Sequence, residues 1–131
     1  MISERKFPKK ERLRNETLIA ELFKKGKRFY YDGFVFIRLF YNNPYPENLK
    51  KFSNIQFFST VRKKEFKSAV KRNRIRRLLK ESYRNNKHLL RELKFEDNKI
   101  LLLGVLYVGK EIPTYNECNE KMLSFINNIL K

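Results

Sequence analysis

The residues of this sequence that are best suited to chemistry are cations. Arginine and lysine recur every four residues along one stretch, and at about 100° per residue they fall in a single row on a helix. This row consists of Arg72, Arg76, Lys80 and Arg84. Like charges at this spacing cost a helix roughly 0.2–0.5 kcal/mol per pair, and no acidic residue within the row relieves them. A phosphate backbone would offset that cost.

Two other interpretations of the basic row are open. A row of Lys and Arg is often only a solvated helix face, and a basic amphipathic helix can also lie on a membrane. Arg outnumbers Lys in residues 71–84, and the further cluster Arg62-Lys63-Lys64 precedes them. Arg suits bidentate phosphate contacts, which favours nucleic acid. The adjoining apolar face, with Ile75, Leu79 and Tyr83, is needed for the core, which argues against the membrane.

No group of side chains has the arrangement expected of a catalytic site within the protein. His88 lies in a polar connector, and Cys118 lies on an apolar helical stripe, where a thiol serves packing. A two-metal nuclease needs converging carboxylates, and the acidic residues are scattered along the chain. No zinc-ligand spacing and no glycine-rich phosphate loop occurs. We therefore expect no catalytic residue and no metal site, and a self-sufficient nuclease is disfavoured.

The composition calls for a polyanionic partner. Lys and Arg number 31 against 14 Asp and Glu, which gives a net charge of +17 at pH 7. Such a charge opposes compaction through self-repulsion unless a polyanion binds. The length fits one domain over residues 1–131, of which 1–10 are expected to form a basic, flexible arm. The single cysteine, the lack of an apolar run of about 18 residues and the lack of a signal peptide predict a cytoplasmic protein with neither a membrane partner nor a disulfide-linked one.

The elements expected around the basic helix alternate between helix and strand. Asn15 is a helix N-cap candidate and Gly26 the expected stop, while Thr114 and Glu117 form a capping box. In chain order we expect a helix after Asn15, strands over 27–31, 34–41 and 54–61 with a loop over 42–53, a helix over 67–85, a helical turn over 88–93, a strand over 99–107 and a helix after Pro113. This order predicts an α+β or α/β fold.

The residue patterns of two of these strands bear on which face of the sheet is core. Val35, Ile37 and Leu39 share one face of their strand, and the other face carries Phe34, Phe36 and Phe40. Periodicity alone does not decide between the faces. Residues 99–107 do not alternate, which indicates a strand that is covered on both sides.

The basic stretch resembles the signature of the bacterial ribonuclease P protein family. That signature runs Val-Ser-Lys-Lys, a short loop, Ala-Val, one residue and Arg-Asn-Arg-Ile-Lys-Arg. The matching residues here are Val61-Arg62-Lys63-Lys64, Ala69-Val70 and Arg72-Asn73-Arg74-Ile75-Arg76-Arg77. Arg12-Leu13, the helix positions Ile19, Leu22 and Phe23, and the basic residues after Gly26 also fit, although Ile19 stands where the family has an aromatic residue. The resemblance extends from about Arg12 to Leu130.

The resemblance implies an αβββαβα fold with a four-stranded mixed sheet and a left-handed strand–helix–strand crossover, against the usual hand. It also implies a subunit that helps a catalytic RNA to remove the 5′ leader of precursor tRNA. Mg²⁺ would be required by the RNA-containing holoenzyme, and the protein alone would bind no cofactor. A ribosomal or general RNA-binding protein without enzymatic function is the alternative.

Site residues carried over by position form two sets. The residues expected at the RNA subunit are Lys63, Lys64, Arg72, Asn73, Arg74, Arg76, Arg77 and Lys80. Those expected at the leader cleft are Arg12, Asn15, Ile19, Phe23, Val35 and Ile37. Core packing is the competing interpretation for the apolar members of the second set.

The composition predicts that affinity for structured RNA falls steeply as salt increases. Each phosphate neutralised contributes roughly −0.7 to −0.9 to the slope of log K against log salt. Filter binding from low to physiological salt measures this slope. A binding constant that hardly changes over this range would contradict a polyanion-binding role.

Overall fold

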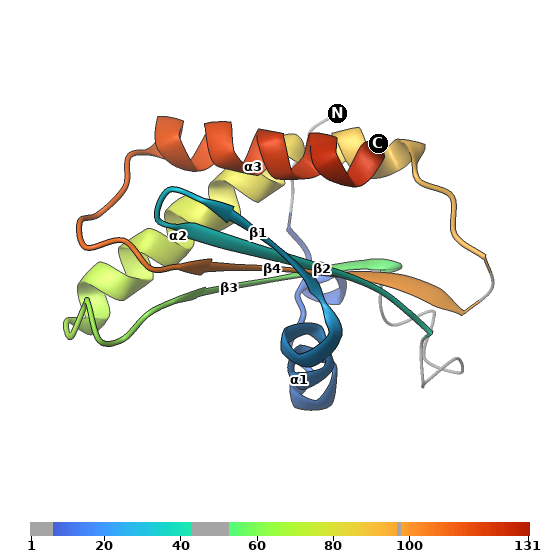
Figure 1. The fold of residues 1–131 in the computed structure, drawn as a ribbon, viewed down its shortest axis with the longest axis horizontal. Helices are drawn as coiled ribbons and strands as arrows, with labels where there is room; N and C mark the ends of the chain where they lie inside the picture. The colour runs from blue at the N-terminus through green and yellow to red at the C-terminus, as the bar shows by residue number, and fades with distance from the viewer. Residues whose placement is uncertain (1–6, 43–52, 97) are drawn as a thin grey trace.

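A four-stranded sheet with helices on both faces forms the body of the molecule (Figure 1). This computed structural model describes residues 7–42, 53–96 and 98–131. The strand order is β1-β2-β4-β3, where the strands are β1 (Lys27–Tyr31), β2 (Phe34–Asn42), β3 (Ile55–Val61) and β4 (Lys99–Tyr107). β2 pairs antiparallel with β1 and β4, whereas β3 and β4 are parallel. The expected α+β class with a mixed sheet is confirmed.

Three helices cover the sheet unequally. α1 (Glu16–Lys25) lies on one face, and α2 (Ala69–Asn86) and α3 (Tyr115–Leu130) lie together on the other (Figure 1). There are also two short 3₁₀ helices. η2 (Lys9–Glu11) precedes α1, and η4 (Lys87–Glu92) follows α2. Among the described helices, none has the length and apolar character that crossing a membrane requires.

Local chemistry sets the helix ends. The Asn15 side chain accepts a hydrogen bond from the Leu18 backbone N–H at 3.1 Å, and Gly26 ends α1 as expected. Thr114 and Glu117 complete the predicted capping box at the start of α3. α2 begins at Ala69, two residues after the predicted start, because the Ser68 hydroxyl accepts from the Lys71 N–H and acts as the N-cap.

β4 and the first half of β2 are buried on both faces, which answers the question that periodicity left open. Val35 and Ile37 of β2 pack with Leu102 of β4 beneath α1. Phe36 and Leu103 point the other way, into the larger core under α2 and α3. The expectation that residues 99–107 form a strand covered on both sides is therefore confirmed.

The described part of the N-terminal segment contacts distant parts of the chain. Phe7 packs edge-to-face on Phe57 and Tyr83, with ring centroids 6.0 and 5.8 Å apart. The Leu13 N–H donates to the Phe57 carbonyl at 2.9 Å, and Glu11 pairs with Lys87 at 2.6 Å. Within the expected arm, Phe7 and Lys10 make long-range contacts, and the flexibility of the arm stays a prediction. Residues 1–6, and residues 43–52 of the expected loop, lie outside the described ranges.

Burial makes Cys118 chemically inert, as its place on an apolar stripe predicts. The side chain is fully enclosed, and this desolvation raises the thiol pKa to about 12. We expect an aromatic disulfide reagent at pH 8 to react slowly with the folded protein and rapidly after denaturation. Equal rates in both states would contradict the burial of this thiol.

Candidate nucleic-acid interface

The orientation of α2 is set by its apolar face. Ile75, Leu79 and Tyr83 are almost completely buried, as the helical spacing predicts. Tyr83 stacks on Phe57 of β3 with ring centroids 4.1 Å apart and an interplanar angle of 2°. A rotation of α2 about its axis would break this packing, so the opposite side of the helix is presented in one fixed direction.

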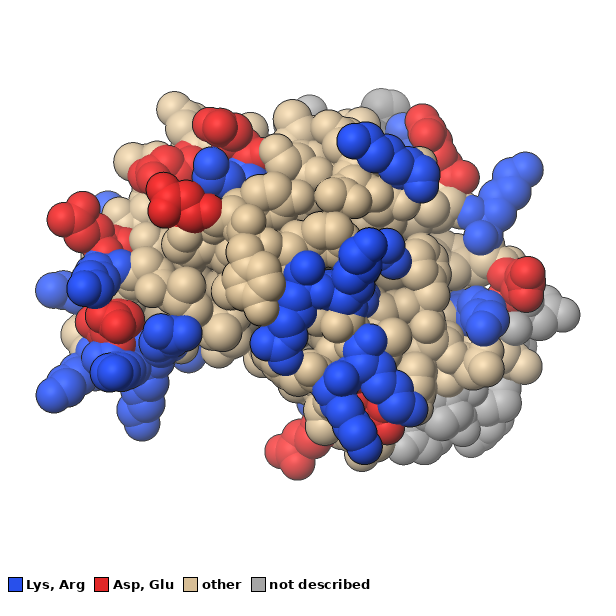
Figure 2. Space-filling model, viewed as in Figure 1, with Lys and Arg blue, Asp and Glu red and all other residues tan. Residues whose placement is uncertain are grey.

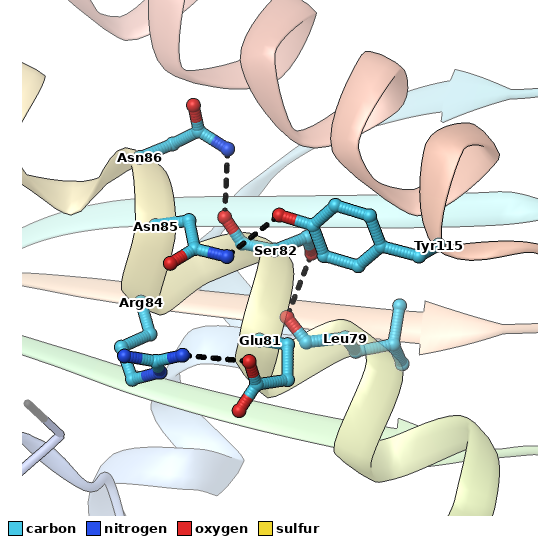
Figure 3. A network of polar contacts seen from close by, with 7 residues as sticks. All are labelled: Leu79, Glu81, Ser82, Arg84, Asn85, Asn86 and Tyr115. Atoms are coloured by element: carbon cyan, nitrogen blue, oxygen red, sulfur yellow. Dashed lines mark hydrogen bonds and ion pairs between the residues drawn. The ribbon is translucent and has the colours of Figure 1, made fainter. Parts of the chain in front are cut away.

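A polar network fastens the C-terminal half of α2 to α3 (Figure 3). The Asn85 side-chain amide donates to the Tyr115 hydroxyl at 2.7 Å. The Asn86 amide donates to the Ser82 carbonyl at 2.7 Å and to Asn119 Oδ1 at 2.6 Å. These bonds satisfy side chains that are partly buried between the helices, and they resist sliding of α2 along the sheet.

The basic row does not act as a single unit. Arg84 pairs with Glu81 at 2.7 Å, so the expectation that no acid relieves the row is wrong at this end, since residues three apart on a helix are neighbours. Arg72 Nη1 donates to the carbonyls of Phe66 and Lys67 at 2.6 and 2.9 Å. Arg72 therefore closes the loop before α2 in addition to carrying charge.

The middle of the row faces a groove. Arg76 and Lys80 lie on one wall of a groove of about 380 Å³ between α2, β3 and the start of α1. The residues lining it are Phe7, Arg12, Leu13, Arg14, Glu16, Ile19, Phe57, Phe58, Ser59, Arg76 and Lys80. The groove thus joins two members of the expected RNA-subunit set with two members of the expected leader cleft, Arg12 and Ile19.

Positive charge is concentrated in this groove. The pKa of Lys80 is lowered by partial burial and, to a smaller extent, by the neighbouring charges of Arg12, Arg76 and Arg14. Of the lining residues, only Glu16 carries a carboxylate. Four converging cations beside apolar side chains suit a phosphate chain whose bases contact the apolar wall.

Phe23 and Asn15 lie next to the groove without lining it. Phe23 packs edge-to-face on Phe58, with ring centroids 6.1 Å apart, and the Arg28 guanidinium lies 6.0 Å from the Phe23 ring. Asn15 caps α1, so its side chain serves the helix that carries Ile19. Phe23 is half-buried.

Val35 and Ile37 have a different place from the one expected of them. Val35 is 8% exposed and Ile37 is completely buried beneath α1. The expectation that they contact RNA in the cleft is therefore revised, since enclosed side chains offer no surface to a ligand. They support α1 from below, which makes core packing their role in this structure.

The remaining expected RNA-subunit residues are exposed. Lys63 and Lys64 occupy the turn after β3, and Arg74 and Arg77 project from α2. Asn73 Oδ1 accepts a hydrogen bond from Arg76 Nη1 at 2.8 Å. This hydrogen bond links the exposed residues of α2 to the wall of the groove.

Sequence reasoning missed Arg14, Phe58 and Ser59 as groove residues. Arg14 lies just before the Asn15 cap of α1, and its position two residues after the assigned Arg12 was the available signal. Phe58 and Ser59 come from β3, whose approach to α1 is a tertiary contact that no local pattern reveals.

The charged side chains are unevenly distributed over the surface. Figure 2 shows blue side chains over α1 and the start of β1 and red ones over the beginning of α3.

The fold and the groove together define a small, basic α+β RNA-binding protein. Within the described ranges, no group of three or more His, Cys, Asp or Glu residues could hold a metal ion. The family model described as Ribonuclease P matches residues 7–127. The chain belongs to the ribonuclease P protein component family, which makes it a protein subunit of this endoribonuclease; RNA binding and tRNA processing follow from the family.

Individual relatives agree with this assignment. A ribonuclease P protein component from Chlorobium phaeobacteroides is 34% identical over 92% of this chain and 86% of its own length. The one from Chlorobaculum tepidum is 31% identical over 99% and 88%. The solved RNase P protein from Thermotoga maritima has a TM-score of 0.64 at 24% identity, covering 90% of this chain and 96% of that one. The one from Staphylococcus aureus has a TM-score of 0.63 at 20% identity, covering 92% and 95%. The structural likenesses support the fold.

Two isoleucines give a test of the revised site. Ile37→Ala should destabilise the protein by roughly 2–5 kcal/mol, because it empties a buried position. Ile19→Ala should cost less stability, because Ile19 is half-buried at the groove. Urea denaturation measures both values. A larger stability loss for Ile19→Ala than for Ile37→Ala would contradict this division between groove and core.

Proposed function

We propose that the groove between α1, β3 and α2 binds the 5′ leader of precursor tRNA. The observation that carries this proposal is the convergence of Arg12, Arg14, Arg76 and Lys80 around an apolar wall. Single-stranded RNA is held by cations along its backbone and by apolar or aromatic surfaces under its bases. A leader is single-stranded, so it matches both features of the groove.

The bases have three side chains to contact. Ile19 and Phe58 line the groove, and Phe23 extends the apolar surface along α1 through its contact with Phe58. Phe58 and Phe23 offer ring edges or faces for stacking, whereas Ile19 makes apolar contact only. None of the three donates a base-specific hydrogen bond, so this wall distinguishes bases weakly.

The RNA subunit binds the other side of α2 in this proposal. Asn73, Arg74 and Arg77 project from the helix, and Lys63 and Lys64 project from the turn before it. Arg76 and Lys80 line the groove and therefore contact the leader rather than the RNA subunit in this proposal. One rigid helix thus separates two RNA contacts and fixes the distance between them.

Catalysis belongs to the RNA in this proposal. The groove holds four cations and a single carboxylate, Glu16, which does not fit the binding of a divalent cation. The Mg²⁺ expected for the holoenzyme would therefore be held by RNA. The protein contributes positive charge where two polyanions meet, which lowers the number of counterions that the complex needs.

The purified protein alone should leave precursor tRNA intact. Addition of the cognate RNA subunit should produce Mg²⁺-dependent cleavage at the mature 5′ end, and the protein should improve this reaction most at low Mg²⁺. Gel analysis of end-labelled precursor measures both effects. Site-specific cleavage by RNA-free protein would contradict the assignment of catalysis to RNA.

Removal of two groove charges should weaken precursor tRNA selectively. Arg14→Gln with Lys80→Gln should reduce the affinity of the holoenzyme for precursor tRNA and lower its salt slope by roughly 0.7 per lost contact. Affinity for mature tRNA, which has no leader, should stay unchanged. The matched control is Lys110→Gln with Lys131→Gln, which removes the same charge at two exposed positions outside the groove.

Affinity measurements with precursors of increasing leader length complete this test. The wild type and the control should gain affinity as the leader lengthens, and the groove variant should gain less. Equal losses for precursor and mature tRNA would show that the groove does not hold the leader.

A further inference from the structure

A second aromatic and basic site lies at the far end of β2, away from the groove. A slot of about 330 Å³ opens between the end of β2 and the segment that leads into β4. The residues lining it are Phe40, Lys94, Phe95, Glu96 and Lys99. Phe40 is 44% exposed, which is unusual for a phenylalanine on a sheet.

Arg38 extends the slot along the same face of β2. Its guanidinium carbon lies 5.8 Å from the Phe40 ring and 5.7 Å from the Phe29 ring. No hydrogen-bond acceptor among the described residues reaches its enclosed Nε. Lys27 in turn lies 5.5 Å from the Phe29 ring. Within the described ranges, aromatic rings rather than carboxylates accompany the positive charges of Arg38 and Lys27.

Core packing does not account for the slot. The Phe29 ring lies 5.8 Å from Phe125 of α3, which gives it a packing role. Phe40, two residues beyond Arg38, is left open instead of being covered in this way. Lys94 and Lys99 add positive charge at the same place, with Glu96 as the one carboxylate in the lining.

The slot and the groove are separate sites. They share no lining residue. Phe40 shares its face of β2 with Phe34 and Phe36, which pack under α2 and α3, whereas Phe58 belongs to the half of the core under α1. The groove lies at the β3 edge of the sheet, between α1 and α2, whereas the slot lies at the end of β2 and the start of β4.

We propose that this slot binds one unpaired nucleotide of the RNA subunit, with the base on the Phe40 ring and the flanking phosphates at Lys94, Lys99 and Arg38. Two rings beside several cations match the flat face and the charge of a nucleotide, since every base has a face that stacks. The RNA subunit is the source because membership of the family implies association with this RNA, and the slot shares no lining residue with the groove. The choice of the RNA subunit as partner depends on membership of the family alone. It does not depend on whether the leader occupies the groove.

The chain contains no tryptophan, so Phe40→Trp introduces a single tryptophan, which can be excited separately from the tyrosines. We expect its emission to be quenched when the RNA subunit binds, because a base stacks on the indole. Tyr30→Trp is the matched control: Tyr30 is 73% exposed and pairs with Val35, whose side chain lies under α1. Equal quenching in the two variants would overturn the proposal, and so would quenching at Phe40→Trp by a leader oligonucleotide but not by the RNA subunit.

Affinity for the RNA subunit gives a second readout. Phe40→Ser should weaken binding roughly five- to a hundredfold, the range that loss of one stacked base produces, without a change in salt slope. Lys94→Gln with Lys99→Gln should lower the slope by roughly 0.7–0.9 per contact. Tyr30→Ser should bind as the wild type does. Thermal melting confirms that each variant is folded, and wild-type affinity in a folded Phe40→Ser variant would overturn the proposal.

Discussion

The structure depends on the docking of one highly charged helix onto the sheet. α2 buries Ile75, Leu79 and Tyr83 and stacks Tyr83 directly on Phe57. Each buried side chain of this size contributes on the order of 1.5–3 kcal/mol, which exceeds the few tenths of a kcal/mol that each like-charged pair on the same helix costs. The apolar face can therefore hold cations close together, although their mutual repulsion favours a phosphate partner.

This arrangement also explains why cations on one helix have different roles. Arg72 and Arg84 are engaged at the two ends of α2, by loop carbonyls and by Glu81. Arg76 and Lys80, between them, line the groove with Arg12 and Arg14. Partial burial lowers the pKa of Lys80, and repulsion from Arg12, Arg76 and Arg14 lowers it further. A polyanion bound there would relieve this repulsion, and this gives the binding energy its electrostatic part.

Local signals in the sequence were sufficient for both ends of α1, for the start of α3 and for the inner face of α2. Asn15, Gly26, Thr114 and Glu117 act within one turn of their own position, so the sequence alone predicts them. The family resemblance then supplied the expected partners of the basic stretch. Long-range contacts could not be predicted in this way.

The groove is the main example, because its walls come from α1, β3 and α2 and meet only in the folded chain. Val35 and Ile37 show the same limit, since a strand covered on both faces gives no periodicity that separates core from cleft. The ion pair between Glu81 and Arg84 could have been predicted from the sequence, because the two residues are three positions apart on one helix. The basic row was defined by residues four positions apart, and this spacing omits a partner that lies three positions away.

The central claim is that α2 holds two RNAs on its two sides, and site-directed photo-cross-linking tests it most directly. Cys118 is buried, so a cysteine introduced at Ser59 in the groove or at Arg77 on the exposed side can be labelled selectively. In the complex of protein, RNA subunit and precursor tRNA, the label at Ser59→Cys should cross-link to the leader, and the label at Arg77→Cys should cross-link to the RNA subunit. Cross-links from both positions to the same RNA would contradict the account.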